Sequence, residues 1–184
     1  MGAIGFHRSV RRIAGTFPAA TRGASIIEFA MLTPIFFALL FAIFEAGIYF
    51  FVSSAVDEAN TKAARMIFTG QAQGGSVSKD AFFDEVCDVV KNFADCDEKL
   101  TVDVARFDSF ADLANDLSSP VCRDGDQADI DAIPFQPGQR LDIVRVRVCF
   151  LYTSVTPGIG LNLPSGRNGV RRIISTSIFR NEPF

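Results

Sequence analysis

The sequence predicts an α+β protein in which a long N-terminal transmembrane helix precedes a small head with a helix packed on an antiparallel sheet of about three strands. Two observations support this prediction. An almost unbroken apolar run covers residues 24–52. Three later segments alternate apolar and polar residues as strands do, namely residues 100–107, 141–153 and 170–180.

Charge is distributed unevenly along the 184 residues. The four arginines before Gly23 face no acid there, and they leave 14 basic against 21 acidic residues after it, a net charge of −7. By the positive-inside rule, we expect the N-terminus in the cytoplasm and the head on the other side of the membrane. No basic stripe remains in the head, so we expect no nucleic-acid partner. Three segments follow: a basic cytoplasmic leader (1–23), a transmembrane and extended helix (24–70) and a periplasmic head (71–184).

The apolar run is long enough to cross a membrane. Counting from Phe29 to Val52, it covers about 36 Å at about 1.5 Å per residue, against a bilayer core of about 30 Å. Its only acids are Glu28 and Glu45. An acid near the bilayer centre costs about 2.5–3.5 kcal/mol and less near its edge, so Glu28 needs a partner such as an amine. Glu45 lies about 26 Å further along the helix, and we expect it near the outer interface.

Helical spacing continues past the bilayer. It predicts one helix over residues 26–69, bent at Pro34 and capped by Gly70. A second helix should begin at Ser78, and a short one should lie within residues 109–117. The apolar face expected for the second helix consists of Phe82, Val86, Val89, Val90 and Phe93.

The longest predicted strand, residues 141–153, has one apolar face. Its other face carries Arg145, Arg147 and Cys149. This alternation predicts a strand that is buried on one face only.

All four cysteines follow the apolar run. An even count in an exported head suggests two disulfides, for which three pairings are possible. We favour Cys87 with Cys96 and Cys122 with Cys149, since the first pair closes a short loop. The spacings do not match those of zinc ligands.

The head contains no histidine, which limits the catalytic arrangements that it can form. The only histidine of the chain, His7, lies in the leader, so the head can contain no Ser-His-Asp or Cys-His arrangement. We therefore expect no enzymatic activity, no cofactor and no small-molecule substrate. Four aspartates between Asp124 and Asp131 could hold calcium, but they lack the register and the closing Glu of an EF-hand, so no metal site is predicted.

The segment Arg22-Gly23-Ala24-Ser25-Ile26-Ile27-Glu28-Phe29 resembles the processing site of type IV prepilins. In that family a peptidase cuts after the Gly, and the Glu five residues later stays in the new N-terminal helix. The resemblance implies a cut between Gly23 and Ala24. It also implies that Glu28 pairs with the amine of Ala24 in a neighbouring subunit during filament assembly.

Together with Pro34 and the ending Arg180-Asn181-Glu182-Pro183-Phe184, this segment makes the chain similar to the TadE-like pseudopilins of the Tad (tight adherence, Flp) pilus. The family implies a minor pilin in the inner membrane that acts in assembly or priming of a type IVb-like pilus and supports adhesion and biofilm formation. Implied partners are the prepilin peptidase, other pilins and pseudopilins, the Tad inner-membrane assembly platform and the membrane. The last residues are either frayed or tied to the head through Arg180 or Glu182.

Other interpretations stay open at this point. A TadF-like role is close to a TadE-like one, whereas the Asp-x-Ser-x-Ser motif of the TadG group is absent from the sequence. An alternative function is an unprocessed, single-span periplasmic sensor or binding module. A membrane-anchored hydrolase is disfavoured by the lack of a ligand cluster or a histidine in the head.

Overall fold

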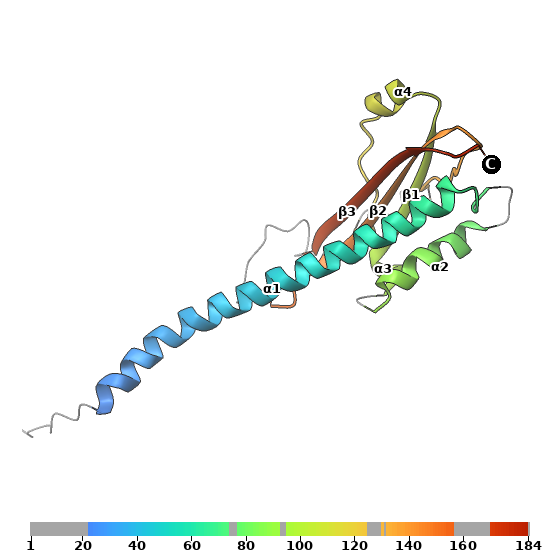
Figure 1. Cartoon of the computed structure of the whole chain (residues 1–184). Coiled ribbons are helices and arrows are strands. Elements are labelled where there is room, and N and C mark those ends of the chain that lie inside the picture. Colours follow the sequence, from blue (N-terminus) through green and yellow to red (C-terminus); the bar gives the residue numbers. More distant parts are fainter. Residues whose placement is uncertain are drawn as a thin grey trace, which may run out of the picture. The chain divides into compact units, whose positions relative to one another are not determined.

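The structure is a computed structural model that describes residues 22–73, 77–92, 95–124, 130, 132–156 and 170–183. The described chain forms two compact units, one up to Phe37 and one from Ala38 onward. As predicted, a long N-terminal helix is followed by an α+β head with a three-stranded antiparallel sheet. The elements, in chain order, are α1 (Arg22–Phe68), α2 (Lys79–Val90), α3 (Cys96–Lys99), β1 (Leu100–Phe107), α4 (Phe110–Asn115), β2 (Ile143–Thr153) and β3 (Val170–Arg180) (Figure 1).

The three strands pair in the order β1-β2-β3, with β2 in the centre and every pair antiparallel. β1 and β3 have the predicted bounds, whereas β2 begins two residues later than predicted. The cause is a turn before the strand, in which Leu141 has a positive φ of 66° and the Asp142 carboxylate accepts a hydrogen bond from the backbone N–H of Gln139 at 2.8 Å. A backbone in the left-handed region cannot continue a strand.

The second half of α1 and helix α2 cover one face of the sheet (Figure 1). The α1 residues that pack there recur every three or four positions, as one face of a helix requires. Asn60, on the same face, donates hydrogen bonds to the hydroxyls of Ser175 and Ser177 at 3.1 and 2.7 Å, so it ties α1 to β3. The core side chains from the two helices are Val52, Val56, Ala59, Ala63 and Ile67 of α1 and Phe82, Val86 and Val90 of α2.

Local capping signals in the sequence are confirmed by the structure. The N-cap hydroxyl of Ser78 accepts from the N–H of Ala81, and Ser109 caps α4 in the same way. Gly70 follows the end of α1 with φ 80°. Helix α1 contains Pro34, and a bend there stays a prediction. Of the remaining face of α2, Val89 is partly buried and Phe93 lies outside the described residues. Helix α3 was not predicted, because four residues are too few for a periodic pattern.

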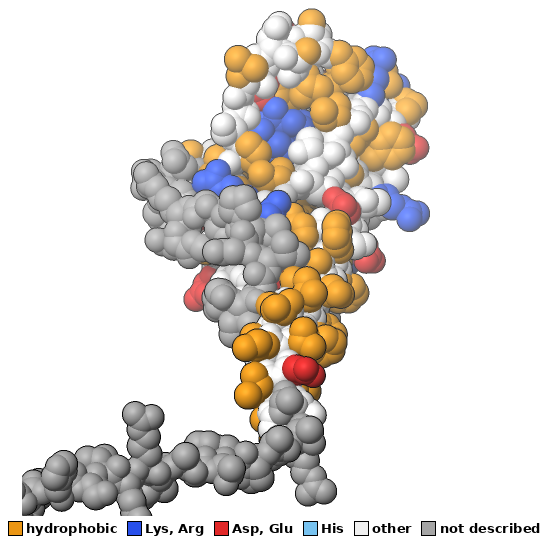
Figure 2. All heavy atoms as spheres, turned by 90° about the vertical axis from the view of Figure 1, so that its left-hand side faces the viewer, with side chains coloured by type: hydrophobic (Ala, Val, Ile, Leu, Met, Phe, Trp, Pro, Cys, Tyr) orange, Lys and Arg blue, Asp and Glu red, His pale blue; other side chains and the backbone are white. Residues whose placement is uncertain are grey.

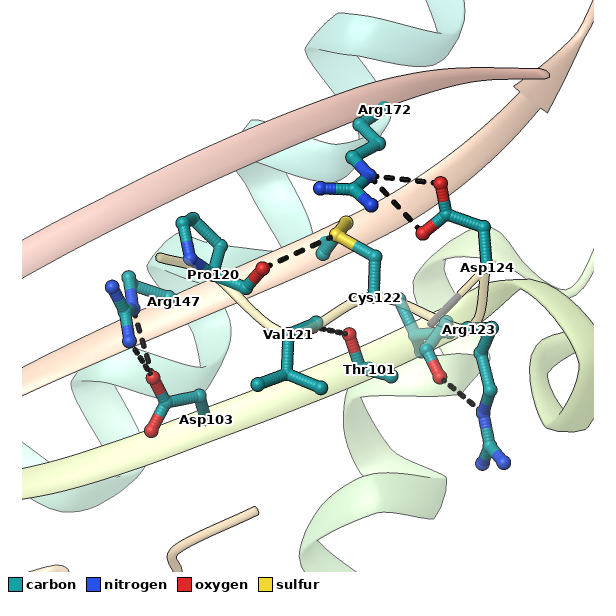
Figure 3. Close-up of a disulfide and its surroundings, with 11 residues drawn as sticks. Thr101, Asp103, Pro120, Val121, Cys122, Arg123, Asp124, Arg147 and Arg172 are labelled. Atoms are coloured by element: carbon teal, nitrogen blue, oxygen red, sulfur yellow. Dashed lines mark hydrogen bonds and ion pairs between the residues drawn. A yellow bond between two sulfur atoms is a disulfide. The ribbon is translucent and has the colours of Figure 1, made fainter. Parts of the chain in front are cut away.

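The prediction that β2 is buried on one face only is wrong. Its arginines face away from the helices, yet Arg145 and Arg147 are 7% and 8% exposed. The irregular segment 116–124 covers them on the outer face of the sheet (Figure 3). A loop of this kind has no periodic pattern, and the sequence therefore could not show that it packs on the strands.

Opposite charges compensate the two buried arginines. Arg147 donates from Nε to Asp103 of β1 at 2.8 Å (Figure 3). Its Nη1 donates to the carbonyl of Ser118, also at 2.8 Å. Arg145 pairs with Asp116. The hydrogen bond from Arg145 lowers the pKa of the Asp116 carboxyl to about 2, so this carboxylate stays charged at any physiological pH.

Two disulfides stabilise the head. Cys87 bonds to Cys96 and joins α2 to α3, and Cys122 bonds to Cys149 and joins the covering segment to β2 (Figure 3). This is the pairing favoured from the sequence. The second disulfide lies beside the hydrogen bond from the Thr101 hydroxyl to the carbonyl of Val121, at 2.7 Å, so the segment is attached to two strands.

Residues 180–182 of the C-terminal tail are tied to the head, and Phe184 lies outside the described residues. The Asn181 side chain is 2% exposed and donates to the carbonyls of Pro137 and Gln139, both at 2.9 Å. The Arg180 side chain donates to the carbonyl of Leu141 at 2.8 Å. The backbone N–H of Glu182 donates to the carbonyl of Phe68, the last residue of α1, at 3.1 Å. The buried contact of the tail is thus made by Asn181, for which no anchoring role was predicted.

We predict that Asp103→Ala lowers the free energy of unfolding by about 3–5 kcal/mol, because it leaves the buried Arg147 without its carboxylate. Asp108→Ala is the matched control, since Asp108 is 79% exposed and its ion pair with Arg106 should contribute at most about 1 kcal/mol. Chemical unfolding of the purified protein in detergent, followed by circular dichroism, measures both. Equal effects would contradict the assignment of a structural role to the buried pair.

Candidate assembly site on the N-terminal helix

The predicted processing bond lies in the first turn of α1. The helix begins at Arg22, so the bond between Gly23 and Ala24 has helical geometry. The N–H groups of a first helical turn have no intrahelical partners. A glycine inside a helix also lowers the stability of that helix by about 0.5–1 kcal/mol relative to alanine. A Cβ added at Gly23 would meet no described atom within 4 Å beyond its two neighbours and the backbone of its own helix. The turn is therefore easy to unwind and its backbone is open to an approaching protein.

Glu28 lies in the next turn and is exposed. Among the residues that the structure describes, no cationic side chain forms an ion pair with it. Phe29 beside it is 71% exposed. Both side chains are thus available to another molecule.

The first part of α1 exposes apolar side chains on every side. At 100° per residue, positions 26, 27, 29, 31 and 32 already surround the helix axis. A helix that is apolar all round belongs in lipid or among other apolar helices. Figure 2 shows hydrophobic side chains gathered along this part of the molecule. The large exposed side chains from here to residue 44 include Ile26, Ile27, Phe29, Met31, Leu32, Ile35, Phe36, Leu39, Ile43 and Phe44.

Length and composition make α1 a candidate membrane span. Within the stretch Ser25–Phe68, the most apolar window has a mean hydropathy of 2.3, and only 11% of that window is buried. A core helix of a soluble protein would be mostly buried instead. Within the described residues this is the one helix that qualifies.

The second acid of the apolar run, Glu45, has a role that the sequence did not show. Its side chain is 1% exposed. It accepts hydrogen bonds from the hydroxyl of Tyr152 at 2.6 Å, from the N–H and hydroxyl of Thr156 at 3.0 and 2.9 Å, and from the N–H of Val155 at 3.2 Å. We call these four residues the Glu45 clamp. It attaches the end of β2 and the following turn to α1.

Aromatic side chains pack beside the clamp. The rings of Tyr49 and Tyr152 meet edge to face at 5.5 Å, and the guanidinium of Arg171 lies 4.8 Å from the centre of the Tyr49 ring. Burial, together with the hydrogen bond to Glu45, raises the pKa of Tyr152 above its ordinary value. Tyr152 therefore stays protonated and remains a hydrogen-bond donor.

No metal site is found in the described part of the chain, where no group of three or more His, Cys, Asp or Glu side chains is placed to hold an ion. Asp124, the first residue of the aspartate-rich loop, forms an ion pair with Arg172 at 2.8 Å (Figure 3). Asp126, Asp129 and Asp131 lie outside the described residues.

These features define a class of protein: a single, apolar, exposed N-terminal helix that continues into the core of a small α+β head. Comparison with known families specifies the class further. The model of the family described as TadE-like protein matches residues 23–65, the stretch that contains Gly23, Glu28, Pro34 and Glu45. This match confirms the resemblance drawn from the segment at Gly23 and from Pro34, and it does not extend to the C-terminal ending. No curated protein and no solved structure matches the chain.

The two acids of α1 should differ in their effect on stability. Glu45→Ala is expected to lower the free energy of unfolding in detergent by at least about 2 kcal/mol, because each buried donor left unpaired costs about 1–3 kcal/mol. Glu28→Ala should change it by less than about 0.5 kcal/mol, since this side chain is exposed. Thermal unfolding monitored by circular dichroism compares the two variants, and similar losses for both would refute the difference in roles.

Proposed function

We propose that the protein is a minor, pilin-like subunit that acts in the assembly or priming of a Tad-type (type IVb-like) pilus and so supports adhesion and biofilm formation. The observation that carries this proposal is the TadE-like match over residues 23–65. It coincides with a helix that exposes apolar side chains all round and an exposed acid, Glu28, near its start. The function is association with other subunits and not catalysis.

Processing by a prepilin peptidase between Gly23 and Ala24 is the first step. The open backbone at Gly23 and the weak first turn of α1 support it. The cut removes the basic leader and creates an amine on Ala24. In the apolar environment of packed helices, this amine and a carboxylate attract each other strongly, whereas either charge alone would be costly.

Glu28 is the acid that receives this amine from a neighbouring subunit. Glu28 lies four positions after Ala24, so two parallel helices bring the groups level when one is shifted by about 6 Å along its axis. The exposed apolar side chains around Glu28 provide the packing surface. The ion pair then sets the axial shift between neighbouring subunits.

Charge and cysteine chemistry support the topology. The basic leader favours a cytoplasmic N-terminus, and the candidate span then places the head in the periplasm as part of a single-pass inner-membrane protein. Both disulfides lie in the head and suit an oxidising periplasm. Partners under this proposal are the prepilin peptidase, other pilins and pseudopilins, and the Tad inner-membrane assembly platform, with entry into an extracellular pilus as the end point.

The intact mass and N-terminal sequence of the protein from its host's membranes test the proposal. We expect a chain that starts at Ala24. A chain that retains Met1 would favour the unprocessed sensor or binding module, and a chain cut at another bond would exclude prepilin-type processing at Gly23.

Glu28→Ala should be cleaved nearly normally but assembled poorly, because the amine of the neighbouring Ala24 loses its carboxylate. Piliation in the host, with N-terminal sequencing of the same cells, separates the two effects. Glu58→Ala removes an exposed acid of the same helix outside the apolar run and serves as the control. Normal piliation in the Glu28 variant would count against the pairing mechanism.

A further inference from the structure

We propose that the Glu45 clamp sets the outer boundary of the bilayer on α1 and holds Val155 against the lipid headgroup region. The apolar run itself does not define this boundary, because uncharged residues continue from Ala46 to Val56. Without a fixed point, α1 could lie at several depths in the membrane. The clamp provides the fixed point, because it attaches a polar turn of the head to the helix.

The bilayer core cannot extend outward beyond Glu45. The residues that follow β2, Val155 and Thr156, direct backbone N–H groups at the Glu45 carboxylate, and they lie in neither a helix nor a strand. Irregular backbone exposed to lipid is not tolerated in the hydrocarbon region. Val155 is 62% exposed. This turn must therefore lie at or outside the boundary.

The core cannot end much before Glu45 either. Ile43 and Phe44 are 73% and 61% exposed, and both would face water if the boundary lay one turn earlier. A span from Ser25 to Phe44 contains 20 residues and covers about 30 Å of helix, which equals the thickness of the hydrocarbon core. The outer and inner limits together place the edge of the bilayer core at the Glu45 clamp.

Aromatic residues agree with this position. The chain has two tyrosines and no tryptophan, and both tyrosines, Tyr49 and Tyr152, contact each other beside the clamp. Tyrosine is enriched where the membrane meets water. Arg171, over the Tyr49 ring, adds a positive charge at the same level, where it can face lipid phosphates.

Fixing the outer boundary also fixes the inner one. With Ser25 at the inner edge of the core, the bond between Gly23 and Ala24 lies just outside it, at the cytoplasmic interface. This last step rests on the proposed function, because it gives the clamp a part in presenting the bond to the peptidase. Glu45 is then a positioning residue for processing, and Glu28 lies about one helical turn inside the membrane.

Single introduced cysteines can locate the boundary, because all four native cysteines are in disulfides. Ile43→Cys and Phe50→Cys form a matched pair, since the native side chains are 73% and 70% exposed. The full chain is reconstituted at low density in vesicles of phosphatidylethanolamine and phosphatidylglycerol. A polar maleimide, which labels cysteines that are exposed to water, is supplied on both sides of the vesicle membrane. We expect loss of labelling at position 43 and labelling at position 50. Equal labelling, or protection at both positions, would overturn the proposal.

The role of the clamp is tested in the same vesicles with a Glu45→Ala background. Labelling at position 50 should fall, because the uncharged run then continues from Phe29 to Val56 and α1 can sink deeper. Glu45→Gln keeps one acceptor and should give a smaller shift, and Glu28→Ala should give none. Unchanged labelling in folded Glu45→Ala and Glu45→Gln proteins would mean that the clamp does not set the boundary.

Cleavage in the host is scored separately for the unsubstituted protein. An uncleaved chain whose boundary lies at Glu45 would count against the proposed function and leave the boundary intact. A cleaved chain whose boundary lies elsewhere would count against the clamp and leave the proposed function intact.

Discussion

The contact between the second half of α1 and the sheet is the constraint on which the rest of the structure depends. One continuous helix must be apolar on all sides at its start and amphipathic toward its end, where Val56, Ala59 and Ala63 are fully buried. The two alanines allow the helix backbone to lie close to the strands. Asn60, held by Ser175 and Ser177, adds a polar contact that favours one position of the helix over others. The head therefore includes its own anchor helix as a core element.

Glu28 and Glu45 show how one residue type serves two purposes on the same helix. Glu45 has its hydrogen-bond donors within the chain, and its burial costs little because Tyr152, Val155 and Thr156 replace water. Glu28 is exposed among apolar side chains, and no cationic side chain in the described part of the chain forms an ion pair with it. Glu45 is thus part of the fold, whereas Glu28 is accessible for the pairing proposed above.

On the outer face of the sheet, charged side chains are buried and not exposed to solvent. Charged residues lie under an irregular segment, and the chain compensates them with Asp103 and Asp116 and with the disulfide from Cys122 to Cys149. Buried ion pairs contribute little net stability, but breaking one is costly, so such a cluster favours a single arrangement of strands and cover. Together with the buried Asn181, these contacts hold the segments outside the sheet in place.

The sequence by itself determined the strands, the helix caps at Ser78 and Gly70, the apolar span and the family resemblance, because periodicity, capping and short motifs are local properties of the chain. The disulfides also followed from the preference for a short loop. Only the tertiary structure decided the partners of Glu45 and the burial of Arg145 and Arg147. Glu45 and Tyr152 are 107 residues apart, and no local pattern encodes which distant donor will reach a buried acid; that depends on how helix and sheet pack.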